Sequence, residues 1–170
     1  KSDEQIQAAY ESDPKSLTVD ELLYCATLTN DNNKKIDIYQ TAANIYSNDY
    51  RAFNNLGACQ FSNGDYTSVA ANFKKALSLN PSSGEANVNL GLISLVNDEY
   101  GKANEQLGNA RGIEAASEAL GVYYLKTGDN KAAVKAFGDT KSNNAALAQI
   151  LTKDYSKAKK TLASITSPDA

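Results

Sequence analysis

The chain has 170 residues, of which 42% are hydrophobic, so it can bury a substantial core as one domain or as one continuous repeat array. Its formal net charge of -3 does not suit a nucleic-acid binder, which usually has a basic face. No run of about 18 apolar residues is present, so we expect no transmembrane helix. Because the chain starts at Lys1 and contains no methionine, we expect a processed form or an excised fragment, and a removed signal peptide stays open.

Charge is unevenly spread along the chain. Residues 1–49 carry four lysines against nine acidic residues, whereas residues 126–170 carry eight lysines against four acidic residues. The plainer interpretation is solvated surface. The alternative is that the charges steer a partner or support head-to-tail contact between copies of the chain.

The N-terminal part of the chain predicts three helices. Residues 1–15 form a short helical lead-in that should end before Pro14, because proline disfavours helix in the residue that precedes it. Ser16 or Thr18 can cap the next helix, whose first turn holds two acidic residues that suit the helix dipole. A third helix is expected over about 34–46, where apolar residues recur at helical spacing.

A more regular pair of helices follows. We expect these helices over about 49–62 and 66–79, joined by a turn in which Gly64 can take the left-handed conformation. Pro81 should end the second helix, because proline cannot continue it.

Parts of this pair return further along the chain. Leu56-Gly57 recurs as Leu90-Gly91 after 34 residues and as Leu120-Gly121 after another 30, and a weaker copy contains Ala145-Ala146. Small residues at one position of each first helix let two antiparallel helices approach closely, and larger side chains fill the space around them. Each pair alone leaves an apolar flank that the next pair can cover.

This period of 34 residues, with its small, aromatic, alanine and proline positions, resembles the tetratricopeptide repeat, and residues 50–83 match it most fully. The resemblance implies an all-α fold, an α-solenoid of five antiparallel helix pairs in which the first and last are degenerate. The expected copies are 16–49, 50–83, 84–113, 114–141 and 142–165, with a tail over 166–170. The fifth copy has a first helix of only about nine residues, and its Lys157, Lys159 and Lys160 should face water as a polar cap.

Residues that could carry catalysis are scarce. The chain contains no histidine, which removes the commonest general base and nitrogen metal ligand, so we predict no catalytic residues, no metal, no cofactor and no enzyme. Cys25 and Cys59 fall at the same position of consecutive first helices. We expect two small buried residues there, with a disulfide as the alternative, since packed helices lie about 8–10 Å apart and a disulfide needs Cα atoms within about 7 Å.

In the family that the chain resembles, the first helix of each pair lines a concave groove that binds a protein or peptide. Carried over to this chain, the partner-binding candidates are Arg51, Asn54, Phe61, Val88, Leu92, Leu95, Val122 and Leu125. The apolar members either bury a segment of a partner or pack on one another, and both interpretations stay open. A carboxylate clamp of the kind found in one subclass is not expected, because apolar or acidic residues stand where its cations should be.

Our hypothesis is a non-catalytic scaffold that binds a peptide or protein segment in this groove, without nucleic acid and without membrane insertion. One alternative is an interaction or spacer module of a larger bacterial envelope protein, which leans towards the periplasm, with the cytoplasm as the other compartment. A second alternative is a self-association module that uses the acidic and basic ends.

Overall fold

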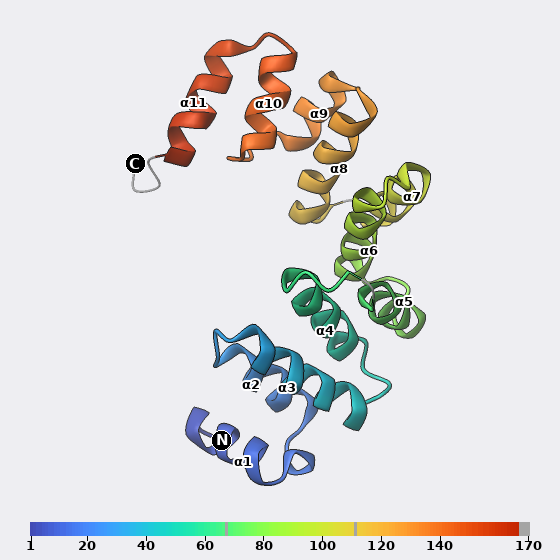
Figure 1. Cartoon of the computed structure of the whole chain (residues 1–170), viewed down its shortest axis with the longest axis vertical. Coiled ribbons are helices and arrows are strands. Elements are labelled where there is room, and N and C mark those ends of the chain that lie inside the picture. Colours follow the sequence, from blue (N-terminus) through green and yellow to red (C-terminus); the bar gives the residue numbers. More distant parts are fainter. Residues whose placement is uncertain (67, 111, 167–170) are drawn as a thin grey trace. The chain divides into compact units, whose positions relative to one another are not determined.

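The computed structural model describes residues 1–66, 68–110 and 112–166, and these residues form eleven α-helices, one 3-10 turn and no strand (Figure 1). The helices are α1 (Asp3–Ser12), α2 (Val19–Thr27), α3 (Asn32–Ile45), α4 (Tyr50–Ser62), α5 (Val69–Leu79), α6 (Gly84–Val96), α7 (Tyr100–Asn109), α8 (Glu114–Thr127), α9 (Asn130–Phe137), α10 (Asn143–Leu151) and α11 (Tyr155–Thr166). The predicted all-α fold of consecutive helix pairs is confirmed. Among the described helices, none is long and apolar enough to cross a bilayer.

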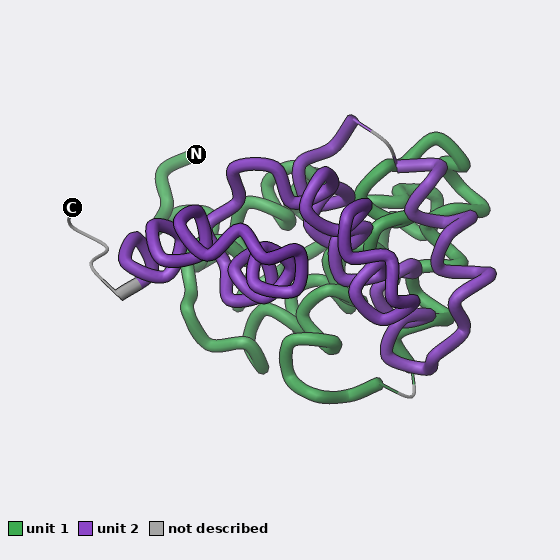
Figure 2. The backbone as a smooth tube through the Cα atoms, turned by 90° about the horizontal axis from the view of Figure 1, so that it is seen from above, with its two compact units in different colours: residues 1–89 green, residues 90–170 purple. Residues whose placement is uncertain are grey.

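The chain divides into two compact units, residues 1–89 and residues 90–170, and the division falls inside α6 (Figure 2). In the first unit, α2 packs on α3, α3 on α4 and α4 on α5. In the second unit, α7 packs on α8, α8 on α9, α9 on α10 and α10 on α11. Each unit therefore repeats the same contact between neighbouring helices.

Several of the described helices start at a residue whose side chain caps them. Thr18 caps α2, because its hydroxyl accepts the Glu21 backbone N–H at 3.2 Å while the Glu21 carboxylate accepts the Thr18 N–H at 3.0 Å. Ser16 instead lies in the 3-10 turn Pro14–Ser16. Helix α5 starts later than we expected, after a turn in which the Ser68 hydroxyl donates to the Asp65 carboxylate at 2.8 Å. Such side-chain hydrogen bonds stabilise a turn in competition with the helix.

The lead-in helix α1 is anchored to the first pair. Ile6 is buried in the same core cluster as residues of α2, α3 and α4. The Lys1 ammonium lies 2.8 Å from the Glu21 carboxylate, and the Tyr24 hydroxyl donates to Asp3 at 2.9 Å. The lead-in is thus a packed part of the first unit.

Close approach between the two helices of a pair explains the small residue in the first helix. A Cβ atom added at Gly57 would lie 2.8 Å from Phe73, one at Gly91 would lie 2.7 Å from Leu107, and one at Gly121 would lie 2.5 Å from Phe137. Real Cβ contacts are longer, so these three positions exclude a side chain unless the partner moves. Ala146 takes this position in the fifth pair and is buried.

Polar pairs also join the two helices of three copies, always with partners twelve residues apart. The Asn72 amide donates to Gln60 Oε1 at 2.7 Å, the Ser94 hydroxyl lies 2.7 Å from the Gln106 side-chain amide, and the Thr161 hydroxyl donates to Gln149 Oε1 at 2.9 Å. Ser94, Gln149 and Thr161 are buried, so their hydrogen bonds satisfy polar atoms that would otherwise lack a partner, whereas Gln60 and Asn72 stay partly exposed.

The two cysteines are free thiols, Cys25 buried and Cys59 partly buried. Burial raises the pKa of both thiols, because the low-dielectric interior disfavours the charged thiolate. The disulfide alternative is therefore not formed in this structure.

Candidate functional site

Arg51, the predicted cation in the groove, is already paired with two carboxylates. Its guanidinium reaches Asp49 at 2.7 Å and Asp20 of α2 at 2.8 Å. Hydrogen bonds to Asp49 and then to Asp20 raise the pKa of Arg51, and the hydrogen bond from Arg51 lowers the pKa of Asp49. A carboxylate ligand would have to compete with both acids, so Arg51 mainly links α4 to α2.

Asn54 and Val88 are buried, with 4% and 3% of their surface exposed. Asn54 Oδ1 accepts a hydrogen bond from the Asn89 amide at 3.0 Å, which joins α4 to the start of α6 inside the first unit. Phe61 keeps partial exposure and packs edge-to-face on Tyr66, with 5.1 Å between the ring centroids. In the first unit, Phe61 is therefore the predicted apolar residue with accessible surface.

The predicted residues of the second unit also divide into core and partly exposed side chains. Leu95 is only 2% exposed and lies in a core cluster with Ala103, Leu107 and Ala119, against which Leu92 and Val122 pack from the edge. Leu125 packs in the same partly buried manner on a second cluster that contains Phe137. Leu92, Leu95 and Val122 thus share one cluster, whereas Leu125 packs on the next cluster along the chain.

Three apolar residues of α10 that were not among the predicted contact residues are exposed. Leu147, Ile150 and Leu151 are 45%, 41% and 48% exposed. They follow Ala146 by one, four and five residues, as Val122, Leu125 and Lys126 follow Gly121. The signal was therefore present in the register of the fifth copy, but the candidate list ended at the fourth.

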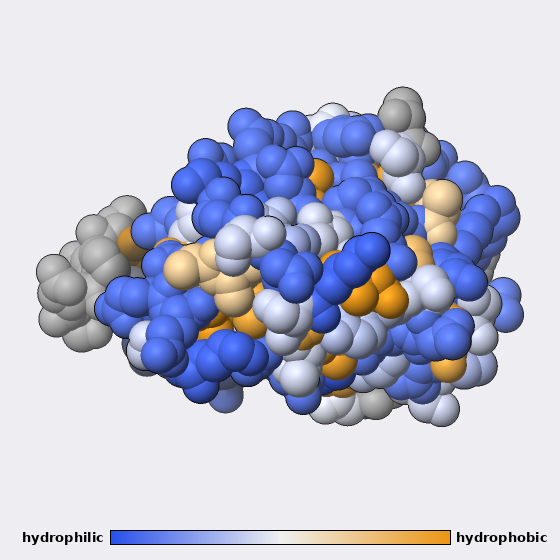
Figure 3. Space-filling view, turned by 90° about the horizontal axis from the view of Figure 1, so that it is seen from below, coloured by the Kyte–Doolittle hydropathy of each residue, from blue (hydrophilic) through white to orange (hydrophobic). Residues whose placement is uncertain are grey.

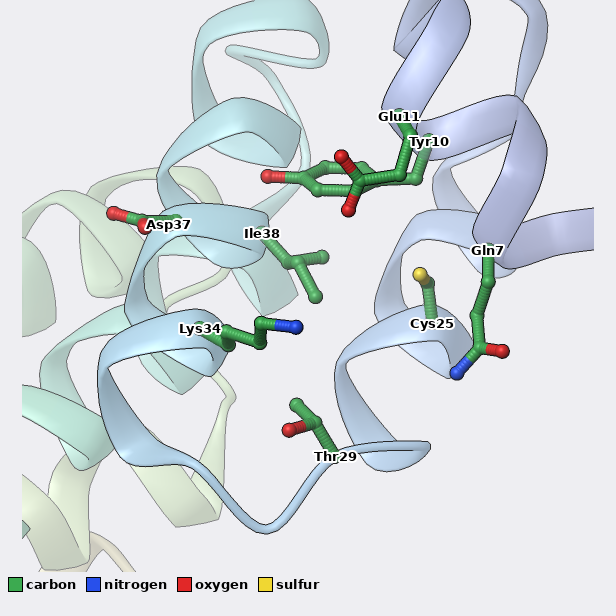
Figure 4. A pocket seen from close by; sticks show the side chains of 8 residues that line it. All are labelled: Gln7, Tyr10, Glu11, Cys25, Thr29, Lys34, Asp37 and Ile38. Atoms are coloured by element: carbon green, nitrogen blue, oxygen red, sulfur yellow. The ribbon is translucent and has the colours of Figure 1, made fainter.

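The first unit contains a cleft of about 510 Å³ that the sequence analysis also did not predict. Figure 4 shows Tyr10 and Glu11 of α1 on one side, Lys34 and Ile38 of α3 on the other, and Cys25 of α2 beside the space between them. The lining mixes apolar surface with both signs of charge. It presents no activated nucleophile, because burial raises the pKa of the Cys25 thiol.

The described residues show no metal-binding cluster, and the face in Figure 3 shows no single broad apolar patch. In the ranges 1–66, 68–110 and 112–166, no group of three or more His, Cys, Asp or Glu residues is placed to hold a metal ion. The face in Figure 3 is mostly hydrophilic, with hydrophobic residues in small separate groups. Small separate groups of hydrophobic residues are normal on protein surfaces, so they do not mark a binding site by themselves.

Comparison with known proteins agrees with this architecture. Residues 50–83 match the tetratricopeptide repeat family, and no curated protein sequence is significantly similar to the chain. A tetratricopeptide repeat protein from Parabacteroides merdae is 13% identical with a TM-score of 0.73, over 97% of this chain and 71% of the other. PilW, a type IV pilus biogenesis factor, is 20% identical with a TM-score of 0.75, over 98% and 85% of the two chains. YrrB, described as a tetratricopeptide repeat protein with an unusual peptide-binding site, is 19% identical with a TM-score of 0.64, over 99% and 95%. The predicted family resemblance is confirmed at the level of the fold.

Proposed function

We propose that this chain, a helical array of the tetratricopeptide-repeat fold with a recognisable repeat at residues 50–83, is a non-catalytic scaffold that binds a protein or peptide segment. The proposed contact residues are the predicted set that keeps accessible surface. They are Arg51 and Phe61 in the first unit and Leu92, Val122 and Leu125 in the second. Asn54, Val88 and Leu95 would support these residues from the interior.

The observation that carries the proposal is the partial exposure of Leu92 and Val122. Both pack on one core cluster, yet neither is fully covered by it. A partner segment that covered them would bury additional apolar surface, which is worth roughly 25 cal/mol per Å² before the costs of association. The peptide-binding description of YrrB supports a peptide as the kind of partner.

The non-catalytic part of the proposal rests on side-chain chemistry. The chain has no histidine, and the pKa values of its two thiols are raised by burial. General acid-base and thiolate catalysis both favour groups that titrate near neutral pH, so this set of side chains suits binding better than catalysis.

Affinity capture from the native host, followed by mass spectrometry, tests the proposal. We expect Leu92→Glu and Val122→Glu to abolish capture of the principal partner while the far-UV circular dichroism stays helical. Tyr155→Glu, which changes an exposed aromatic residue at the start of α11, is the matched control and should capture the partner normally. Folded Leu92 and Val122 variants that still capture the same protein would contradict the proposed site.

A further inference from the structure

The first helix of a pair packs on the pair before it through alanines that lie in the core of that preceding pair. Ala52 of α4 joins the core cluster of α2 and α3, and Ala119 of α8 joins the cluster that contains Leu95 and Leu107. Ala145 and Ala148 of α10 likewise join the cluster that contains Phe137 of α9. A helix that docks on a preceding pair in this chain therefore presents small residues to it, which permits close approach.

The residues of the preceding pair on which such a first helix packs can also be identified. Val122 and Leu125 of α8 pack, partly buried, against the cluster formed with Ala145 and Ala148 of α10. The equivalent positions in α10, twenty-five residues after Val122 and Leu125, are Leu147 and Ile150. These two side chains are 45% and 41% exposed. These two residues define what we call the α10 face.

The expected lysine cap lies on the other helix of this pair. Lys159 and Lys160 of α11 are exposed and Lys157 is partly buried. Residues 141–166 contain five lysines and a single acidic residue, Asp154, so this pair carries a net positive charge. Charge complementarity therefore favours an acidic partner.

Lys153 holds a position that forms an ion pair with the next first helix in another copy. Asp98, in the left-handed turn after α6 with φ 58°, lies 3.4 Å from the ammonium of Lys126 on the following first helix. Lys153, with φ 66°, holds the equivalent left-handed position after α10, three residues beyond Ile150 as Asp98 is three beyond Leu95. A helix that docked on α10 would therefore meet a lysine where α8 meets an aspartate.

We propose that the α10 face binds an α-helix of a partner protein, seated as α10 is seated on α8. Small residues of that helix lie against Leu147 and Ile150, and an acidic side chain pairs with Lys153. This surface lies on the pair formed by α10 and α11 and its occupant is a helix, so the proposal does not depend on the binding of a segment at Leu92 and Val122.

A peptide with the sequence of residues 114–127 is the probe, because α8 is itself a helix that seats on a preceding pair. A side-chain cross-link on its solvent side is needed, since isolated helices of this length are marginal in water. We would compare the natural peptide with its Lys126→Glu form. At low salt the Glu form should bind about fivefold more tightly, which is the upper range for an exposed ion pair. In the Lys153→Glu variant of the protein the preference should reverse.

Three variants of the protein complete the test. Leu147→Glu combined with Ile150→Glu changes exposed side chains, so it should fold normally and lose about tenfold or more in affinity for both peptides. Val96→Glu, at an apolar position of α6 that is 54% exposed, and Leu92→Glu should leave peptide binding unchanged. The Leu92 result separates this surface from the proposed groove.

Several results would overturn the proposal. These are binding that ignores the α10 substitutions, no binding of either peptide in the millimolar range, or an unchanged preference in Lys153→Glu. Sedimentation of the free protein gives a further check. A dimer that dissociates on Leu147→Glu would make a second copy of the chain the occupant and would exclude a separate partner.

Discussion

The third and fifth helix pairs carry large apolar residues at the same two positions of their first helices, yet these residues have different environments. Leu92 and Leu95 follow Gly91 by one and four residues, as Leu147 and Ile150 follow Ala146. Leu95 is 2% exposed, because Ala119 of the next first helix belongs to its cluster, whereas Ile150 is 41% exposed. Repeat register thus decides where a side chain points, and the neighbouring helix decides whether it is core or surface.

The same comparison clarifies the proposed binding sites. An exposed residue at a register position that is elsewhere covered by a helix is a candidate for helix docking. A residue that is partly covered even with its neighbours present, such as Leu92, is a candidate for binding a segment on top of the packed array.

The largest effect should come from placing a charge four residues after the small residue of the first helix, which is Leu95 in the third pair and Ile150 in the fifth. Leu95→Glu should destabilise the fold by about 3–5 kcal/mol or more, because the carboxylate would be buried without a partner. Ile150→Glu should change the free energy of unfolding by less than about 0.5 kcal/mol, since its side chain faces solvent. Urea denaturation followed by circular dichroism measures both. Equal destabilisation by the two variants would remove the contrast between the third and fifth pairs.

A second comparison concerns the close approach of helices within a pair. Gly121→Ala should cost about 1–3 kcal/mol, because the new Cβ would lie 2.5 Å from the Phe137 ring and the ring or backbone must shift. Gly101→Ala in α7 meets no atom within 4 Å, so it should stabilise the helix by up to about 1 kcal/mol. Thermal unfolding of both variants gives the sign of each effect. A stabilising Gly121→Ala would show that the pair tolerates a wider spacing.

A third comparison concerns the polar pairs between helices. Thr161→Val should cost about 1–3 kcal/mol, because it leaves the Gln149 amide, which is 2% exposed, without its partner. Asn72→Ala should cost less, since the Gln60 amide is partly exposed and water can replace the lost hydrogen bond. Replacing both Gln149 and Thr161 with apolar residues should recover most of the stability. If the double variant is no better than the single one, the pair contributes through packing instead.

Much of the fold follows from the sequence because its signals are local. Gly57, Gly91 and Gly121 recur in register with a large residue sixteen positions later, which fixes the close helix approach. Thr18 and Glu21 form a capping box that marks the start of α2. Such features depend on short spacings, so a single sequence is sufficient to find them.

The candidate site was predicted less completely because exposure depends on neighbours that are distant in sequence. The pattern treats Leu92 and Leu95 alike, and only the packing of α7 and α8 makes Leu95 core. The partners of Arg51 show the same limit, since one of its two carboxylates, Asp20, lies thirty-one residues away. The pairing of Lys126 with Asp98 also depends on a turn whose left-handed residue is not glycine.

The smallest effect concerns the acid dependence of the Arg51 pairs. The hydrogen bond from Arg51 lowers the pKa of Asp49 in the folded state, so folding favours its ionised form. That contribution is fully present above the ordinary carboxyl pKa of about 4 and is lost as the pH falls through the lower folded value. Arg51→Gln should therefore cost up to about 1 kcal/mol at pH 7, and the cost should shrink as the pH falls below about 4. Lys102→Gln, which removes the i,i+3 ion pair with Glu99 on an exposed surface, is the control and should cost less at either pH. Urea denaturation at both pH values measures the difference. If the cost of Arg51→Gln does not change with pH, this side chain stabilises the first unit through packing of its methylene groups instead.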